Sequence, residues 1–175
     1  SVTERVIRFA DVPVLTARSD VETGPAGNCD DVLVPTDGSD PAAVAVDHGI
    51  AIADRFDARL HVVSVVDVGD LANRLDYDSP AEGVQRVTED REAVVAEIAD
   101  RAREAGVEVT TAVEEGYPAE TLLDYADDEG IDLIAMGTHG RTGLNRYLLG
   151  STTERLVRHA EAPVLAVNAR HLTED

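Results

Sequence analysis

Short apolar runs alternate with longer amphipathic stretches along this chain, and that alternation limits the folds open to it. Strands are expected at residues 31–35, 59–66, 107–113, 131–136 and 164–167. Helices are expected from Ser39 or Asp40 to about Phe56 and at residues 84–105, 118–128 and 152–160, with an irregular stretch at 68–83. Strands that alternate with helices form a parallel sheet with right-handed crossovers. The pattern therefore predicts an α/β fold.

A glycine-rich stretch follows the apolar run 131–136, and the helical pattern 152–160 follows the glycines. Glycine lets the backbone approach a ligand and adopt angles closed to other residues, which we expect of Gly137 and Gly140. Gly150 and Ser151 should present unpaired amides and a hydroxyl at a helix start, where the helix dipole favours an anion. The layout predicts a loop that holds phosphates; the alternative is a strand-to-helix loop that holds nothing.

The spacing of this stretch is G-x-x-G, nine residues, then G-S, at Gly137, Gly140, Gly150 and Ser151. It is neither the P-loop nor the dinucleotide fingerprint G-x-G-x-x-G. It resembles the ATP-binding signature of the universal stress protein (UspA-like) family. The resemblance implies a doubly wound, five-stranded parallel sheet of strand order 3-2-1-4-5 with helices on both faces, Rossmann-like and adenine nucleotide alpha hydrolase-like. It also implies ATP, or AMP or ADP, as the ligand, with or without Mg²⁺.

A sheet of that order reverses its winding between the first and fourth strands, and ligands bind beyond the carboxyl ends at such a switch point. Pro35, Thr36 and Asp37 follow the first strand, while Met136 and Gly137 end the fourth. Topology and motif therefore predict one pocket. The resemblance implies that Asp37 lies at the adenosine end of the nucleotide; its alternative role is a turn or helix cap.

Further candidates complete the predicted nucleotide site. The resemblance implies that the backbone of Val62 contacts adenine. Met136 could pack on the base or in the core, Thr152 and Thr153 could serve phosphates or cap the helix, and Arg141 could pair with phosphate or stay solvated. The predicted site comprises Pro35, Thr36, Asp37, Val62, Met136, Gly137, Gly140, Arg141, Gly150, Ser151, Thr152 and Thr153.

The sequence offers little for rapid catalysis. The histidines lack metal-ligand spacing, and no nucleophile stands beside an evident base. The resemblance implies a nucleotide-dependent binding or regulatory protein of the stress response, and the missing catalytic groups lead us to expect at most slow ATP hydrolysis. Two alternatives stay open: a nucleotide-free interaction module of the same fold, and an adenylating enzyme of the PP-loop type. The Ser-Gly-Gly-x-Asp-Ser loop of the latter is poorly matched by Thr36-Asp-Gly-Ser39.

An internal repeat links the two ends of the chain. Residues 1–17 align with residues 151–167 at a constant offset of 150, and nine of the seventeen positions are identical. We expect residues 1–18 to be the helix–strand end of a preceding repeat, 19–30 a linker, 31–170 a complete domain and 171–175 a tail. The chain is then the second half of a tandem protein, or a fragment or fusion of one; an N-terminal extension is the alternative. We expect the strand Val12–Ala17 to pair with Pro163–Val167, within the chain as a pseudo-dimer or between two chains of a homodimer.

The charge of the chain is strongly negative. Asp and Glu number 35 against 15 basic residues, all arginine, for a net charge of −20. Such a field disfavours nucleic-acid binding and is typical of halophilic proteins, in which salt screens the self-repulsion. The single cysteine cannot form an internal disulfide, and the chain shows neither a membrane span nor a signal peptide. We expect a cytoplasmic protein with no membrane partner.

Overall fold

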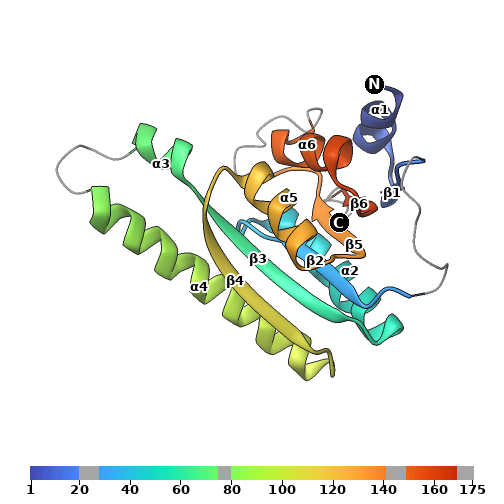
Figure 1. The fold of residues 1–175 in the computed structure, drawn as a ribbon, viewed down its shortest axis with the longest axis horizontal. Helices are drawn as coiled ribbons and strands as arrows, with labels where there is room; N and C mark the ends of the chain where they lie inside the picture. Colours follow the sequence, from blue (N-terminus) through green and yellow to red (C-terminus); the bar gives the residue numbers. More distant parts are fainter. Residues whose placement is uncertain (20–27, 75–79, 141–148, 169–175) are drawn as a thin grey trace, which may run out of the picture.

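The computed structural model describes residues 1–19, 28–74, 80–140 and 149–168. These residues form one sheet of six strands with helices on both faces, in the strand order β1-β6-β5-β2-β3-β4 (Figure 1). The strands are β1 Val14–Thr16, β2 Asp31–Pro35, β3 Arg59–Asp67, β4 Val109–Gly116, β5 Leu133–Gly137 and β6 Val164–Val167. The helices are α1 Val2–Phe9, α2 Asp40–Phe56, α3 Val68–Arg74, α4 Pro80–Glu104, α5 Pro118–Asp128 and α6 Ser151–His159.

The N-terminal strand changes the architecture of the sheet. The pairs β2–β3, β2–β5, β3–β4 and β5–β6 are parallel, while β1 pairs antiparallel with β6. The sheet is therefore six-stranded and mixed, and the prediction of a five-stranded, wholly parallel sheet is wrong. The reason is that β1 satisfies the backbone groups on the outer edge of β6, where an unpaired strand would be left exposed. The expected pairing of Val12–Ala17 with Pro163–Val167 is confirmed within the chain for Val14–Thr16.

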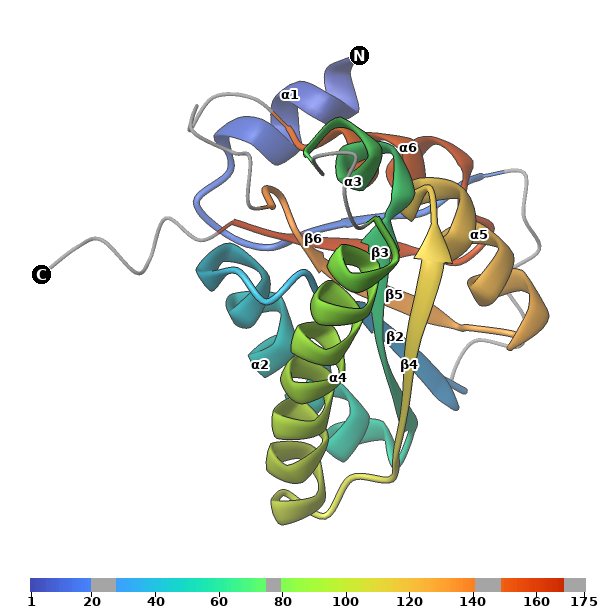
Figure 2. The ribbon, with the colours of Figure 1, turned by 90° about the vertical axis from the view of Figure 1, so that its left-hand side faces the viewer.

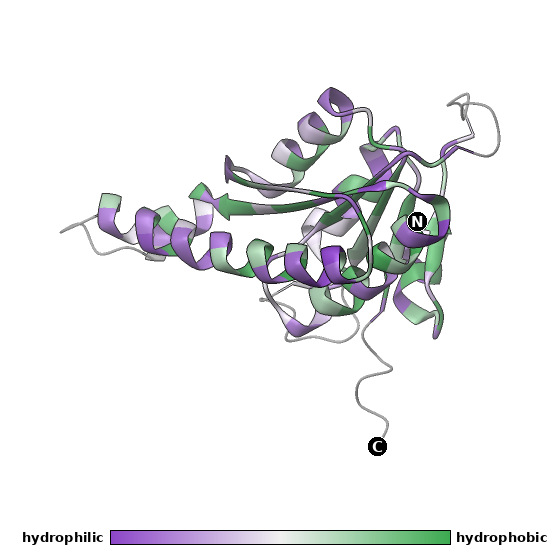
Figure 3. Ribbon diagram, turned by 90° about the horizontal axis from the view of Figure 1, so that it is seen from below, coloured by the Kyte–Doolittle hydropathy of each residue, from purple (hydrophilic) through white to green (hydrophobic). Residues whose placement is uncertain are grey.

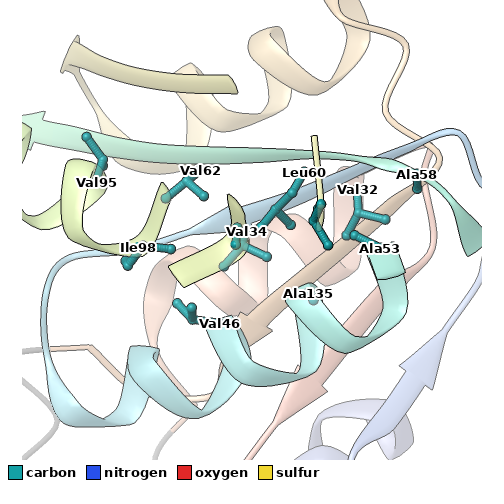
Figure 4. Packing of buried hydrophobic residues seen from close by; sticks show 12 residues of the cluster. Val32, Val34, Val46, Ala53, Ala58, Leu60, Val62, Val95, Ile98 and Ala135 are labelled. Carbon is teal, nitrogen blue, oxygen red and sulfur yellow. The ribbon is translucent and has the colours of Figure 1, made fainter. Parts of the chain in front are cut away.

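Two apolar cores lie on the two faces of the sheet. One core joins α2 and α4 to the sheet through Val34, Val46, Leu60, Val62 and Val95 (Figure 4). The other joins α5 and α6 to the opposite face. Consecutive residues of the inner strands are buried on alternate faces because helices cover both. In Figure 3 the hydropathy colours follow this layering, with apolar strands inside and polar outer faces on the helices.

The stretch 68–83 differs from its prediction as an irregular segment. It holds α3 and the first turn of α4, with residues 75–79 outside the described part (Figure 2). The Asp67 carboxylate accepts hydrogen bonds from the amides of Gly69 and Asp70, at 2.9 and 3.1 Å, and so caps the start of α3. Pro80 begins α4 at a position where a missing N–H costs nothing. None of the described helices is long and apolar enough to cross a membrane.

Candidate functional site

A cavity of about 300 Å³ opens at the carboxyl ends of the parallel strands, where β2 lies between β3 and β5. Three segments of the predicted site meet in it: the end of β2, the end of β5 with the glycine loop that follows it, and the start of α6. Ten of the twelve predicted residues line it, namely Pro35, Thr36, Asp37, Met136, Gly137, Gly140, Gly150, Ser151, Thr152 and Thr153. The structure thus brings them together at the switch point of the sheet.

Gly137 is required by close packing against backbone, whereas Gly140 lies close only to the end of the Asp37 side chain, and neither has an unusual backbone angle. Neither Gly137 nor Gly140 has a left-handed backbone conformation, and Gly150 has φ −61°. A Cβ on Gly137 would lie 2.8 Å from the backbone oxygen of Pro41, and one on Gly140 would lie 2.8 Å from Asp37 Oδ2. The expectation of special angles at Gly137 and Gly140 is therefore wrong. Their missing side chains let the loop after β5 approach the loop after β2.

The loop after β2 is held by the side chain of Asp37 and by a serine of β3. Asp37 Oδ1 accepts hydrogen bonds from the amide and the hydroxyl of Ser39, at 3.0 and 2.5 Å. The Thr36 carbonyl oxygen accepts a 2.7 Å hydrogen bond from the buried hydroxyl of Ser64 on β3. Asp37 therefore shapes the turn through one oxygen, while its second oxygen faces Gly140. Both of the roles considered for Asp37 remain compatible with this geometry.

Arg91 is a lining residue that the predicted site omitted. It lies on α4, is 8% exposed, and donates a hydrogen bond to the backbone oxygen of Asp37. The cavity is also lined by Asp67 and Asp70 at the junction of β3 and α3. Within the described part of the chain, Arg91 is the only arginine among the lining residues, against three aspartates. An anionic ligand would therefore have to lie near Arg91 and the start of α6.

The start of α6 supplies backbone donors. Gly150 is the N-cap, and its amide donates a 2.9 Å hydrogen bond to the Thr138 carbonyl oxygen. The expectation that this amide is unpaired is therefore wrong. The amides of the first helical turn, from Ser151 onward, have no acceptor within the helix. The Thr153 hydroxyl donates a 2.8 Å hydrogen bond to the Gly137 carbonyl oxygen and is buried. Thr153 thus anchors the glycine loop to α6.

The apolar wall of the cavity differs in part from the prediction. Val62 is fully buried between the sheet and α4 and does not line the cavity (Figure 4). Its neighbours Val63 and Val65 do line it. Arg141 lies outside the described residues. Further lining residues that the predicted site omitted are Ala42, Val63, Val65, Asp67, Asp70, Arg91, Pro118, Leu122 and His139.

Some of these omissions had a signal in the sequence. Apolar residues of α4 recur at Val84, Val87, Val94 and Ile98, and Arg91 interrupts that series on the same side. A charged residue inside an apolar stripe indicates a buried partner or ligand. His139, between the loop glycines, lies 2.8 Å from the Thr138 hydroxyl through Nδ1 and lines the cavity. No group of three or more potential metal-binding His, Cys, Asp or Glu side chains occurs in the described ranges.

This fold and this cavity define a doubly wound type of α/β protein, with a Gly-rich loop and a helix start at the switch point of the sheet. Comparison with protein families matches residues 29–168 to the universal stress protein family. The chain belongs to that family.

Individual relatives agree with this assignment. The universal stress protein MJ0531 of Methanocaldococcus jannaschii is 39% identical over 141 residues, which cover 78% of this chain and 80% of the relative. The solved structure of MJ0577, from the same organism, is 30% identical with a TM-score of 0.73. The match covers 81% of this chain and 97% of the MJ0577 chain. A universal stress protein crystallised in complex with cAMP is 27% identical with a TM-score of 0.60, and the match covers 81% of this chain and 98% of that protein.

Proposed function

We propose that this chain binds an adenine nucleotide, ATP or else AMP or ADP, and acts as a nucleotide-dependent binding and regulatory protein of the stress response. The observation that carries the proposal is the meeting of Asp37, after β2, with Gly140 and Ser151 of the distant Gly-rich stretch around one cavity. The complex of a related universal stress protein with cAMP, an adenine nucleotide, supports the same class of ligand.

The phosphates fit the end of the cavity that Gly150 and the first turn of α6 line. Free amides and the helix dipole favour an anion there. Gly140 cannot be enlarged without meeting Asp37, so the space beside the loop is closely defined. Arg91 adds a positive charge to a cavity that otherwise carries three carboxylates. Mg²⁺ bound with the nucleotide would reduce the repulsion from those carboxylates further.

The base and ribose fit the remaining lining. Val63, Val65, Leu122 and Met136 provide an apolar wall of the kind that a purine ring can pack against. Asp37 Oδ2 faces the cavity beside Gly140, and a carboxylate there can accept hydrogen bonds from ribose hydroxyls. This division keeps the carboxylate of Asp37 at the nucleoside and the amides of α6 at the phosphates.

The two alternatives predict different outcomes. An adenylating enzyme would release pyrophosphate from ATP, and a nucleotide-free module would bind no adenine nucleotide. We favour binding without rapid turnover because the described lining includes no metal-binding cluster and no hydroxyl nucleophile hydrogen-bonded to a histidine base, apart from the Thr138–His139 contact inside the loop. A cytoplasmic location and a saline habitat remain predictions from the sequence.

The deciding experiment is to purify the protein in molar KCl, denature it, and identify any released nucleotide by mass spectrometry. Gly140→Val should abolish the bound nucleotide because its side chain would meet Asp37. Ala51→Val, on the exposed side of α2, adds bulk away from the cavity and serves as the control. A wild-type protein that stays empty after incubation with Mg-ATP would reject the proposal, and release of pyrophosphate would select the adenylating enzyme.

A further inference from the structure

The strands that end at the cavity lie in the order in which the parts of a nucleotide are joined. In the sheet, β2 lies between β5 and β3 (Figure 1). In the proposed function, the start of α6 beyond β5 takes the phosphates, Asp37 after β2 takes the ribose, and Val63 and Val65 of β3 take the base. Neighbouring strands are about 4.8 Å apart, so this order spans roughly 10 Å of the cavity. The groups that β3 presents beside the base therefore decide which base fits.

Strand β3 extends beyond the strand beside it. Pro35, the last residue of β2, lies opposite Val63, and β3 continues for four more residues to Asp67. Val63, Val65 and Asp67 are alternate residues of β3, so their side chains lie on one face of the sheet, and all three line the cavity. Successive members of this row are about 6.6 Å apart along the strand. A purine packed on the two valines therefore has Asp67 at one of its polar edges.

The orientation of the Asp67 carboxylate is fixed by the start of α3. Its Oδ1 accepts hydrogen bonds from the amides of Gly69 and Asp70, at 2.9 and 3.1 Å. Both bonds go to the same oxygen, and Oδ2 accepts no hydrogen bond from the part of the chain that the structure describes. Asp67 is half-buried and lines the cavity. Its second oxygen is thus an acceptor that can receive a ligand without any rearrangement of the side chain.

The other charged side chains that line the cavity lie away from this end of β3. Asp37 Oδ2 lies against Gly140, in the loop after β5. Arg91 donates a hydrogen bond to the backbone oxygen of Asp37, beside the end of β2. Asp70 is exposed on α3. Asp67 is therefore the charged group that continues the row of the two valines.

We propose that Asp67 determines which base the cavity accepts, and that it favours a purine with an amino group at C6 over a purine with an oxo group there. This inference rests on the proposed function, because it names the residue that recognises the base in the same cavity. The amino group of adenine donates hydrogen bonds, whereas guanine and hypoxanthine carry the acceptor O6 at the same position. An ionised carboxylate accepts hydrogen bonds and cannot donate one. Asp67 thus attracts the first kind of base and repels the second, and both effects add to specificity.

The substitution Asp67→Asn exchanges an acceptor for a donor at a single atomic position. The oxygen of asparagine can keep both hydrogen bonds to the amides of Gly69 and Asp70, since Asn and Asp cap helices equally well. The amide nitrogen then takes the place of Oδ2 and donates hydrogen bonds. The variant should therefore favour the 6-oxopurine that wild type rejects.

Calorimetric titration of the nucleotide-free protein with ATP and with inosine triphosphate (ITP) measures this preference. The two ligands share the ribose and the triphosphate and differ in the base. Wild type should bind ATP roughly tenfold to hundredfold more tightly than ITP, whereas Asp67→Asn should bind ITP at least as tightly as ATP. AMP and IMP provide the same comparison with one phosphate. Each preference is a ratio measured on one protein, so a general loss of affinity in the variant does not alter it.

Asp70→Asn is the matched control, because it removes the same charge from the lining of the cavity at an exposed position. It should strengthen the binding of ATP and ITP alike and keep the preference for ATP. The role of Asp67 is overturned if wild type binds the two nucleotides equally, if Asp67→Asn keeps the full preference for ATP, or if Asp70→Asn loses that preference to the same extent. A wild-type protein that binds none of the four nucleotides would reject the proposed function itself, whereas binding without preference would reject only the role of Asp67.

Discussion

The Arg91 guanidinium donates a hydrogen bond to the backbone oxygen of Asp37, which joins the middle of α4 to the loop after β2. Asp37 lies in turn against Gly140, in the loop after β5. Arg91 is buried, so this contact is shielded from water. One arginine thus fixes the spacing of the two loops that form the cavity.

Arg91→Met should weaken the binding of both ATP and adenosine, and that of ATP more strongly, because Arg91 holds the loop after β2 and also adds a positive charge to the cavity. A hydrogen bond from a charged group contributes about 1.5–3 kcal/mol, which corresponds to roughly a tenfold to hundredfold loss of affinity. Calorimetric titration of both ligands measures it, with Arg101→Met as the control because Arg101 pairs with Asp47 on the surface. A loss confined to ATP would mean that Arg91 acts on phosphate and not through Asp37.

Thr153→Val should destabilise the fold and weaken nucleotide binding together. The substitution keeps the shape of the side chain but leaves the Gly137 carbonyl oxygen without the 2.8 Å hydrogen bond it receives in a buried position. A buried polar group left unsatisfied costs about 1–3 kcal/mol. Denaturant unfolding measures the loss.

Thr88→Val is the matched control for Thr153. The Thr88 hydroxyl donates to the Val84 carbonyl oxygen within α4, where a side-chain bond of this kind adds little to helix stability. Equal losses in the two variants would show that the Thr153 bond has no special role in anchoring the loop.

The features of the fold that depend on local signals could be predicted from the sequence. The end of β2 and the end of β5 were placed because short apolar runs stop there at Pro35 and at Gly137. Helix α5 and strand β6 begin and end where predicted, since Pro118 starts the first and Pro163 precedes the second. The meeting of these segments in one cavity followed from the switch-point rule.

The sequence did not show in the same way which side chains of the buried strands line the cavity. Residues 60–66 of β3 are apolar except for His61 and Ser64, because helices cover both faces of the sheet. Without polar alternation, the sequence does not reveal that Val63 and Val65 line the cavity while Val62 faces α4. The position of Arg91 inside an apolar stripe indicates a buried partner, but that partner lies 54 residues away and no local pattern identifies it.

The alkaline stability of the protein should depend on Tyr125. Burial, together with the nearby carboxylates, raises its pKa to about 12, against an ordinary value of about 10. Its hydroxyl lies 2.9 Å from Nδ1 of the buried His61, whose Nε2 lies 2.8 Å from an Asp31 oxygen. The neutral phenol is therefore favoured in the folded state. This stabilisation is complete below pH 10 and is lost as the pH rises through about 12.

Denaturant unfolding between pH 8 and pH 12 tests this dependence. Because the chain contains no lysine, whose ordinary pKa of about 10.4 lies in this interval, the groups that titrate there are the tyrosines and Cys29, whose pKa is raised by burial. Tyr125→Phe should cost about 1 kcal/mol at pH 8, through the lost hydrogen bond, but should lose less stability than wild type on going to pH 12. Parallel curves for the two proteins would exclude Tyr125 as the responsible group.

High salt should stabilise this protein through screening of its own charge. A net charge of −20 makes the folded state repel itself, and the screening length falls from about 10 Å at 0.1 M salt to about 3 Å at 1 M. The melting temperature of the nucleotide-free protein should therefore rise with KCl, by about 2–4 °C for each kcal/mol gained in a domain of this size.

A less acidic variant tests whether charge repulsion is the cause. Glu92, Glu97 and Glu104 are exposed on α4, and changing all three to glutamine makes the net charge less negative, from −20 to −17. This variant should be more stable than wild type at 0.1 M KCl and should gain less from added salt, because less repulsion remains to be screened. A melting temperature that stays constant or falls with KCl would contradict a halophilic origin, and an equal gain in both proteins would assign the effect to strengthened apolar burial.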